Sequence, residues 1–146
     1  MKELSLRALQ AYLGLVCAFH IVIGAGINSS PSFIERVAEL YGAQVDLNNH
    51  QFLTILHPLG AFMLILGVLA AVAAAQPIRY RAVGYSFAGL FVIRAVQRVV
   101  FKQDLEDAFR ISSTHNLFNI CLFLALGISL AALQWYAERQ QGVRTS

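Results

Sequence analysis

Four long apolar runs dominate the sequence and restrict what the chain can fold into. Each is close to the length of about 20 residues that a helix needs to cross the hydrocarbon layer of a bilayer. Charged residues make up only 13% of the chain, whereas they are about a quarter of an ordinary soluble domain. The sequence therefore predicts an all-α integral membrane protein, a bundle of four transmembrane helices. The predicted spans are residues 8–27, 52–75, 82–101 and 117–136.

The rest of the chain is too short for a second domain. With 146 residues in total, we expect a single transmembrane domain over 1–146. The net charge of +3 raises the question of nucleic acid, but the basic residues lie at the ends of the runs and form no stripe. We therefore expect no nucleic-acid partner and interpret the basic residues as topology signals.

The distribution of lysine and arginine predicts the orientation in the membrane. One side collects most of them: Lys2, Arg7, Arg79, Arg81, Arg139 and Arg144. By the positive-inside rule this side is cytoplasmic, so both termini are predicted inside and the two longer loops outside. The location we expect is the inner membrane of a bacterium. The first run is longer than the apolar part of a signal peptide and precedes no clear cleavage site, so we expect it to be retained.

Both outer loops carry features of helices. In 31–44, apolar residues recur at helical spacing between charged ones, after a Ser30-Pro31 start that suits a helix N-terminus. This pattern predicts a short amphipathic helix on the membrane surface, and its simplest role is to cap the bundle. The second loop, 102–114, is acidic, and a helical lid is one interpretation of it.

Apart from those near the cytoplasmic ends, the strongly polar side chains of the runs fall in the outer half of the predicted bundle. They are our candidate binding residues: His20, His57, Arg94, Gln97, Arg98, His115 and Asn119. Arg94, Gln97 and Arg98 lie three and four positions apart, which places them on one face of a helix. Because lipid offers polar groups no partner, we expect that face to point into the bundle. The sequence thus predicts an outward-facing pocket with this face as one wall.

The two arginines lack a carboxylate inside the membrane, because no Asp or Glu occurs within the four predicted spans. Arg98 lies nearer the surface and can extend its charge to lipid headgroups, so Arg94 is the more constrained of the two. Its partner is then a backbone carbonyl, a lipid phosphate, an anionic ligand or a loop acid such as Asp104, Glu106 or Asp107. The competing interpretation is that both arginines only tie the loops to the bundle.

Three kinds of ligand fit the candidate residues. The first is haem b, with axial ligands from His20 and from His57 or His115. Gly24 and Gly60 would leave space for its ring, and an arginine would meet its propionates. The second is a quinone or another amphipathic head group, held by an imidazole and an arginine. The third is zinc or copper on the three histidines, although a lone membrane histidine more often links helices through a hydrogen bond.

Two further features predict packing rather than binding. Cys17 and Cys121 lie in separate runs, where a free thiol packs as a small apolar group. The small residues of 67–75 are expected to let one helix approach another closely. Neither feature adds to the candidate site.

The order of the segments along the chain is itself informative. A first helix at the N-terminus leads to an outer segment that ends 40-LYGAQVDLNNHQF-52, and a second helix has the form 58-PLGAFMLILGVLAA-71. The third helix carries arginine near its outer end. This layout resembles that of small four-helix membrane proteins of the DoxX-like and DUF4345-like type. The resemblance implies a non-catalytic role, or an accessory role in a membrane redox system.

The function we expect is that of a small integral membrane binding or accessory protein. Its pocket would hold an amphipathic or anionic ligand, a lipid, quinone or haem, in connection with membrane redox chemistry. Two alternatives stay open: a haem-b or quinone-dependent membrane oxidoreductase, and a small oligomeric transporter. The missing carboxylates argue against a proton-coupled relay. The expected partners are the lipid bilayer and other membrane subunits or further copies of the chain.

Overall fold

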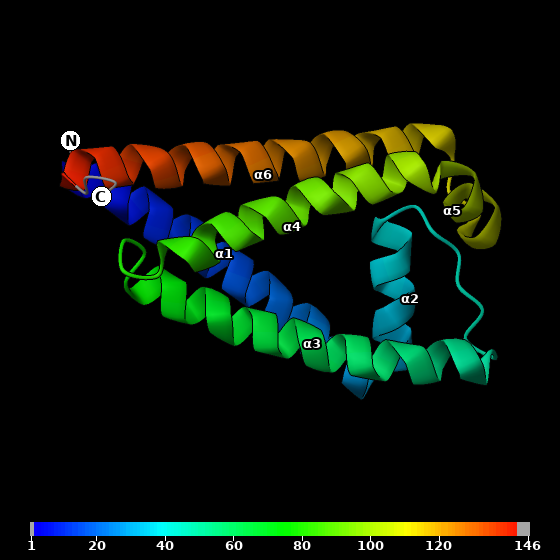
Figure 1. The fold of residues 1–146 in the computed structure, drawn as a ribbon. Coiled ribbons are helices and arrows are strands. Elements are labelled where there is room, and N and C mark those ends of the chain that lie inside the picture. Colours follow the sequence, from blue (N-terminus) through cyan, green and yellow to red (C-terminus); the bar gives the residue numbers. More distant parts are fainter. Residues whose placement is uncertain (1, 143–146) are drawn as a thin grey trace.

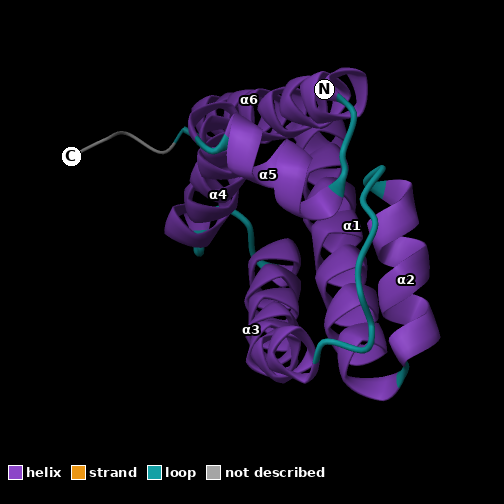
Figure 2. Cartoon of the chain, turned by 90° about the vertical axis from the view of Figure 1, so that its right-hand side faces the viewer, coloured by secondary structure: helices purple, strands orange, loops and turns teal. Residues whose placement is uncertain are grey.

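Residues 2–142 are described by the computed structural model, and within them the chain forms six helices and no strand (Figure 2). The helices are α1 (Lys2–Ser29), α2 (Pro31–Leu40), α3 (His50–Ala75), α4 (Arg81–Val100), α5 (Lys102–Phe109) and α6 (Ser113–Gln141). Four of these described helices, α1, α3, α4 and α6, are long and apolar enough to cross a membrane. The predicted fold class, an all-α membrane protein with four spanning helices, is confirmed.

The helices extend beyond the apolar runs at several ends, because capping and not hydropathy decides where a helix stops. At the start of α3, the Asn49 side chain accepts a hydrogen bond from the Phe52 N–H at 3.1 Å. At the start of α6, the Ser112 hydroxyl accepts one from the His115 N–H at 3.3 Å. The amphipathic segment predicted over 31–44 ends earlier, at Leu40, and Gly42 follows with a left-handed φ of 71°.

The spanning helices are arranged as two pairs (Figure 1). α1 packs chiefly on α3, and α4 packs chiefly on α6, while α1 also meets α6. The start of α1 and the end of α6 lie together at one end of the bundle, which we call the terminal end. α2 and α5 lie at the opposite end, which we call the loop end, and the two pairs diverge toward it. Arg144 and the side chain of Lys2, both counted in the charge bias, lie outside what the structure describes.

Glycines bring α1 and α3 into close contact. A Cβ on Gly24 would lie 2.7 Å from the Gly60 carbonyl oxygen, and one on Gly67 would lie 2.6 Å from Ile21 Cδ1. The close packing predicted for the small residues of 67–75 is therefore present at Gly67. The expectation that Gly24 and Gly60 leave space for a haem ring was wrong. The backbone of α3 fills the space beside Gly24, and the Asn28 side chain and the Gly24 carbonyl oxygen fill the space beside Gly60.

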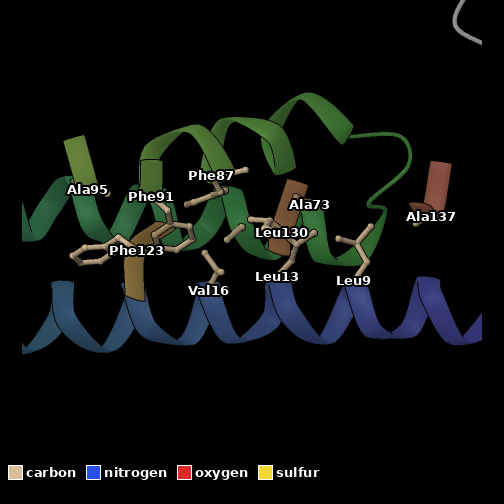
Figure 3. Close-up of a cluster of buried hydrophobic side chains, with 12 residues drawn as sticks. Leu9, Leu13, Val16, Ala73, Phe87, Phe91, Ala95, Phe123, Leu130 and Ala137 are labelled. Atoms are coloured by element: carbon tan, nitrogen blue, oxygen red, sulfur yellow. The ribbon is translucent and has the colours of Figure 1, made fainter. Parts of the chain in front are cut away.

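Apolar side chains from all four spanning helices fill the space between the pairs (Figure 3). Leu9 and Leu13 of α1 lie against Phe87 of α4 and Leu130 of α6, all of them buried. The two cysteines of the chain are free thiols, as expected.

The outer surface of the bundle is also apolar. On α3, large apolar side chains remain exposed at helical spacing: Ile55, Leu59, Phe62, Ile65, Val68, Leu69 and Val72. In water such a surface would favour aggregation, whereas in a bilayer it meets lipid chains. The apolar residues of each spanning helix thus fall into two sets, one buried inside the bundle and one facing the lipid.

Candidate functional site

A cavity of about 420 Å³ lies along the half of α4 that is nearer the loop end. Its lining residues are Tyr41, Arg94, Gln97, Arg98, Phe101, Leu105 and Phe123. The face of α4 that carries Arg94, Gln97 and Arg98 forms one wall of this cavity. α5 contributes Leu105 and α6 contributes Phe123. We call this the arginine cavity.

Arg98 is held by the start of α6. Its Nη1 donates to Asn116 Oδ1 at 2.9 Å, and Asn116 Nδ2 lies 3.4 Å from both the Arg98 carbonyl oxygen and Glu106 Oε1. Glu106 also accepts a hydrogen bond from the Ser113 hydroxyl at 2.8 Å and lies 4.0 Å from Lys102 Nζ. The loop acid therefore does fold back toward the bundle, but it reaches Arg98 only through the Asn116 amide.

Arg94 has weaker partners. Its Nη2 lies 3.6 Å from the Met63 sulfur, and its guanidinium carbon lies 5.8 Å from the centre of the Phe123 ring. A thioether is a weak acceptor, and a ring face attracts a cation by about 0.5–2 kcal/mol. Arg98 lies 5.9 Å from the same ring. Within residues 2–142 neither arginine forms an ion pair, so two guanidinium charges flank one aromatic ring without a carboxylate.

Tyr41 closes the cavity from the side of α2. Its ring stacks on Phe123 with centroids 6.2 Å apart, and Arg98 lies 5.8 Å from its centre. Its carbonyl oxygen accepts a hydrogen bond from Asn119 Nδ2 at 3.1 Å. Burial raises the pKa of the Tyr41 phenol, against the opposing charges of Arg94 and Arg98. The phenol is therefore neutral at physiological pH and remains a hydrogen-bond donor.

Tyr41 and Phe123 were not among the residues predicted for the site. The sequence places Tyr41 on the apolar face of a surface helix and Phe123 inside a spanning run, which gives no sign that they meet. The one available signal is the depth of Phe123, which lies one turn beyond Asn119 on α6. Their contact depends on how α2 crosses toward the α4/α6 pair.

A second cavity of about 260 Å³ lies between α1 and α6. Its lining residues are Tyr12, Leu15, Val16, Phe19, Tyr41, Phe91, Leu122, Phe123 and Leu126. They are apolar or aromatic, and the Tyr12 hydroxyl already donates to the Leu126 carbonyl oxygen at 2.9 Å. We call this the apolar cavity. It shares Tyr41 and Phe123 with the arginine cavity.

The histidines and Asn119 line neither cavity. His20 is fully buried, and its Nδ1 donates to the Val16 carbonyl oxygen at 2.8 Å, while its Nε2 has no partner within the described residues. The rings of Phe19 and Phe87 lie edge-on to it.

His57 and His115 are exposed near the loop end. His57 Nδ1 lies 3.3 Å from Asn28 Oδ1, and His115 Nδ1 lies 3.1 Å from the Ser112 hydroxyl. Over residues 2–142, no three His, Cys, Asp or Glu side chains are grouped so that they could hold a metal ion. The structure thus does not bring His20, His57 and His115 together as ligands of one ion.

The remaining candidate residues support the Tyr41 turn. Asn119 is buried, and its amide holds the Tyr41 carbonyl group. A Cβ on Gly42 would lie 2.7 Å from the His115 ring, so that ring packs against the turn. We therefore assign Asn119 and His115 to positioning Tyr41, one step behind the cavity wall.

Comparison of the chain with family models, with curated proteins and with solved structures finds no match. The resemblance to the DoxX-like and DUF4345-like groups stays a prediction from layout. The functional argument therefore rests on the geometry of the two cavities.

Proposed function

We propose that this integral membrane protein binds the anionic head of an amphipathic molecule in the arginine cavity. The observation that carries the proposal is the pair of partly buried guanidinium groups around Phe123, which have no carboxylate partner among the described residues. The cavity is large enough for a small head group, at about 420 Å³.

Charge energetics favour an anionic occupant. A charge within the membrane is costly unless it is paired or hydrated. A guanidinium group matches a carboxylate or phosphate with two parallel hydrogen bonds, and such bonds are about twice as strong as neutral ones. This wall carries Arg94, Arg98 and the exposed amide of Gln97. One bound anion would therefore pair with both guanidinium charges.

The depth of the cavity favours a ligand that resides in the bilayer. Arg94 lies about 9 Å along α4 from Val100, at 1.5 Å of rise per residue. This depth is below the surface but within reach of a lipid head that is drawn inward. A quinone head carries no charge, so it would leave both arginines unpaired. A haem would find no histidine in the wall of this cavity.

The orientation and the role belong to the same proposal. Arg7, Arg79, Arg81 and Arg139 all lie at the terminal end, so the positive-inside rule supports a cytoplasmic terminal end and an outward-facing cavity. A bacterial inner membrane is the location we propose. An accessory role beside membrane redox subunits rests on the resemblance in layout.

The test compares arginine variants in lipid nanodiscs. The parent, Arg94→Leu, Arg98→Leu and the double variant are placed in phosphatidylcholine with and without phosphatidylglycerol, and bound lipid is measured by native mass spectrometry. We expect the parent to retain the anionic lipid and the double variant to lose it. Arg81→Leu is the matched control, because Arg81 is an exposed arginine at the opposite end of the same helix. Equal retention by the parent and the double variant would overturn the proposal.

A further inference from the structure

The two cavities adjoin each other through a pair of aromatic rings. Tyr41 and Phe123 line both, and their rings stack at 6.2 Å with an interplanar angle of 18°. One side of this pair carries the two arginines, and the other side carries apolar residues of α1 and α6. Polar and apolar binding surfaces therefore meet across a single aromatic partition.

The apolar cavity has the character of a chain-binding site. Its residues from α1 are Tyr12, Leu15, Val16 and Phe19, and those from α6 include Leu122 and Leu126. Leu15 is 73% exposed on the apolar outer surface, so the cavity has a lining residue in contact with lipid. A hydrocarbon chain can enter such a site without leaving an apolar environment.

Resting on the proposed function of the arginine cavity, we propose that the two cavities are the head and chain subsites of one binding site. The ligand is an amphiphile with a phosphate or carboxylate head at Arg94 and Arg98 and a hydrocarbon chain in the apolar cavity. The bound ligand lies across Tyr41 and Phe123, with its head on one side of the two rings and its chain on the other. Charge complementarity selects the head, and the apolar lining selects a chain over a free anion.

The structure explains why Tyr41 suits this position. Its ring is held by contacts with Phe123 and Arg98, and its backbone by Asn119. The ring contacts are individually weak, about 0.5–1.5 kcal/mol for a pair of rings. A ligand that replaces them with its own contacts can shift the ring while the turn stays in place.

The test uses three probes that share a phosphate group: inorganic phosphate, butyl phosphate and dodecyl phosphate. Each is titrated onto the full chain in phosphatidylcholine nanodiscs, and binding is measured by the shift in thermal unfolding and by native mass spectrometry. Val16→Phe fills the apolar cavity from its buried side, and Leu15→Trp narrows it from the lipid side. Val68→Phe and Leu59→Trp make the same changes at exposed positions of α3 outside both cavities.

We expect both cavity-filling variants to bind dodecyl phosphate more weakly than their controls, by roughly three- to tenfold, which corresponds to about 0.7–1.4 kcal/mol. Butyl phosphate should bind to variant and control alike, because its chain is too short to need the second subsite. Comparing variant with control at each chain length cancels the difference in partitioning of the probes into the bilayer.

The outcomes separate the two proposals. If the filled variants bind all alkyl phosphates like their controls, the apolar cavity is not the chain subsite, and this inference fails while the head site stands. If inorganic phosphate binds as tightly as dodecyl phosphate, the ligand is a free anion, and the inference also fails. If no probe binds, or if Arg94→Leu and Arg98→Leu leave every affinity unchanged, the proposed head site is wrong as well.

Discussion

Arg94 and Arg98 share one face of α4 but differ in what their removal would leave behind. Arg98 satisfies the Asn116 amide oxygen, whereas Arg94 touches a sulfur atom and a ring face. Depth alone suggested that Arg94 is the more constrained residue. The structure shows that Arg98 has the stronger protein partner, so the two arginines should separate stability from binding.

The first prediction follows from this difference. Without ligand, Arg98→Leu should destabilise the protein by about 1–3 kcal/mol, since the buried Asn116 amide loses its donor. Arg94→Leu should change stability little, because it leaves no carboxylate unpaired. With an anionic lipid present, Arg94→Leu should lose the stabilisation that the parent gains. Thermal unfolding in detergent, with and without lipid, measures both effects.

Lysine at the same position tests geometry. Arg94→Lys keeps the charge but loses the planar fork, so lipid stabilisation should return only in part if the anion is bound by two parallel hydrogen bonds. Full recovery would mean that a single charge is enough. A ligand-free parent that is much more stable than Arg94→Leu would contradict the conclusion that Arg94 has only weak internal partners.

His20 gives the second prediction. Its Nε2 is buried without a partner in the part of the chain described, and such an atom costs about 1–3 kcal/mol of desolvation. His20→Leu should therefore leave the free energy of unfolding unchanged or raise it, as judged by thermal unfolding. A strong loss of stability in His20→Leu would show that Nε2 holds a ligand. A Soret band or bound metal that is present in the purified parent and absent from the variant would show the same.

At the scale of the elements, hydropathy and spacing predicted much of the fold. The four spans and the amphipathic segment are evident because each depends on residues close in sequence. The divergence of the two helix pairs was not predictable in this way, since it depends on contacts between residues far apart in the sequence, and the stacking of Tyr41 on Phe123 is likewise such a contact. The wall formed by Arg94, Gln97 and Arg98 follows from spacing within one helix, whereas the opposite wall requires the tertiary fold.

The third prediction concerns the α1–α3 interface. Gly24→Ala places a Cβ 2.7 Å from the Gly60 oxygen, and overpacking of this kind costs about 1–3 kcal/mol. Gly14→Ala is the matched control on the same helix, because nothing lies within 4 Å of its Cβ position. That change should be neutral or stabilising by about 0.5–1 kcal/mol, as expected for glycine within a helix. Equal melting temperatures for the two variants would contradict the close packing.

At the scale of the whole molecule, the distribution of charge distinguishes the two ends. The terminal end carries Arg7, Arg79, Arg81 and Arg139, whereas the loop end carries acidic residues on both α2 and α5. The structure places these ends on opposite sides of four helices that are able to span a membrane. Which end faces the cytoplasm remains a prediction from this bias.

The fourth prediction tests that orientation. In a background with Cys17→Ala and Cys121→Ala, Ser32→Cys should react with an impermeant thiol reagent added to intact cells. Gln141→Cys, at the other end, should react only after the cells are permeabilised. Both parent side chains are exposed, so access to the reagent is limited by the membrane alone. The reverse pattern would move the arginine cavity to the cytoplasmic half.

The divergence of the two helix pairs has a mechanical consequence. The pairs lie close together at the terminal end and apart at the loop end. Their longer helices are about 40 Å long, at 1.5 Å of rise per residue, so a change in tilt of a few degrees at the terminal end moves the other end of such a helix by about one to three ångströms. A helix whose apolar stretch is longer than the hydrocarbon layer can adapt to it by tilting. A change in membrane thickness that altered this tilt would therefore change the spacing between the helix pairs around the aromatic stack of Tyr41 and Phe123.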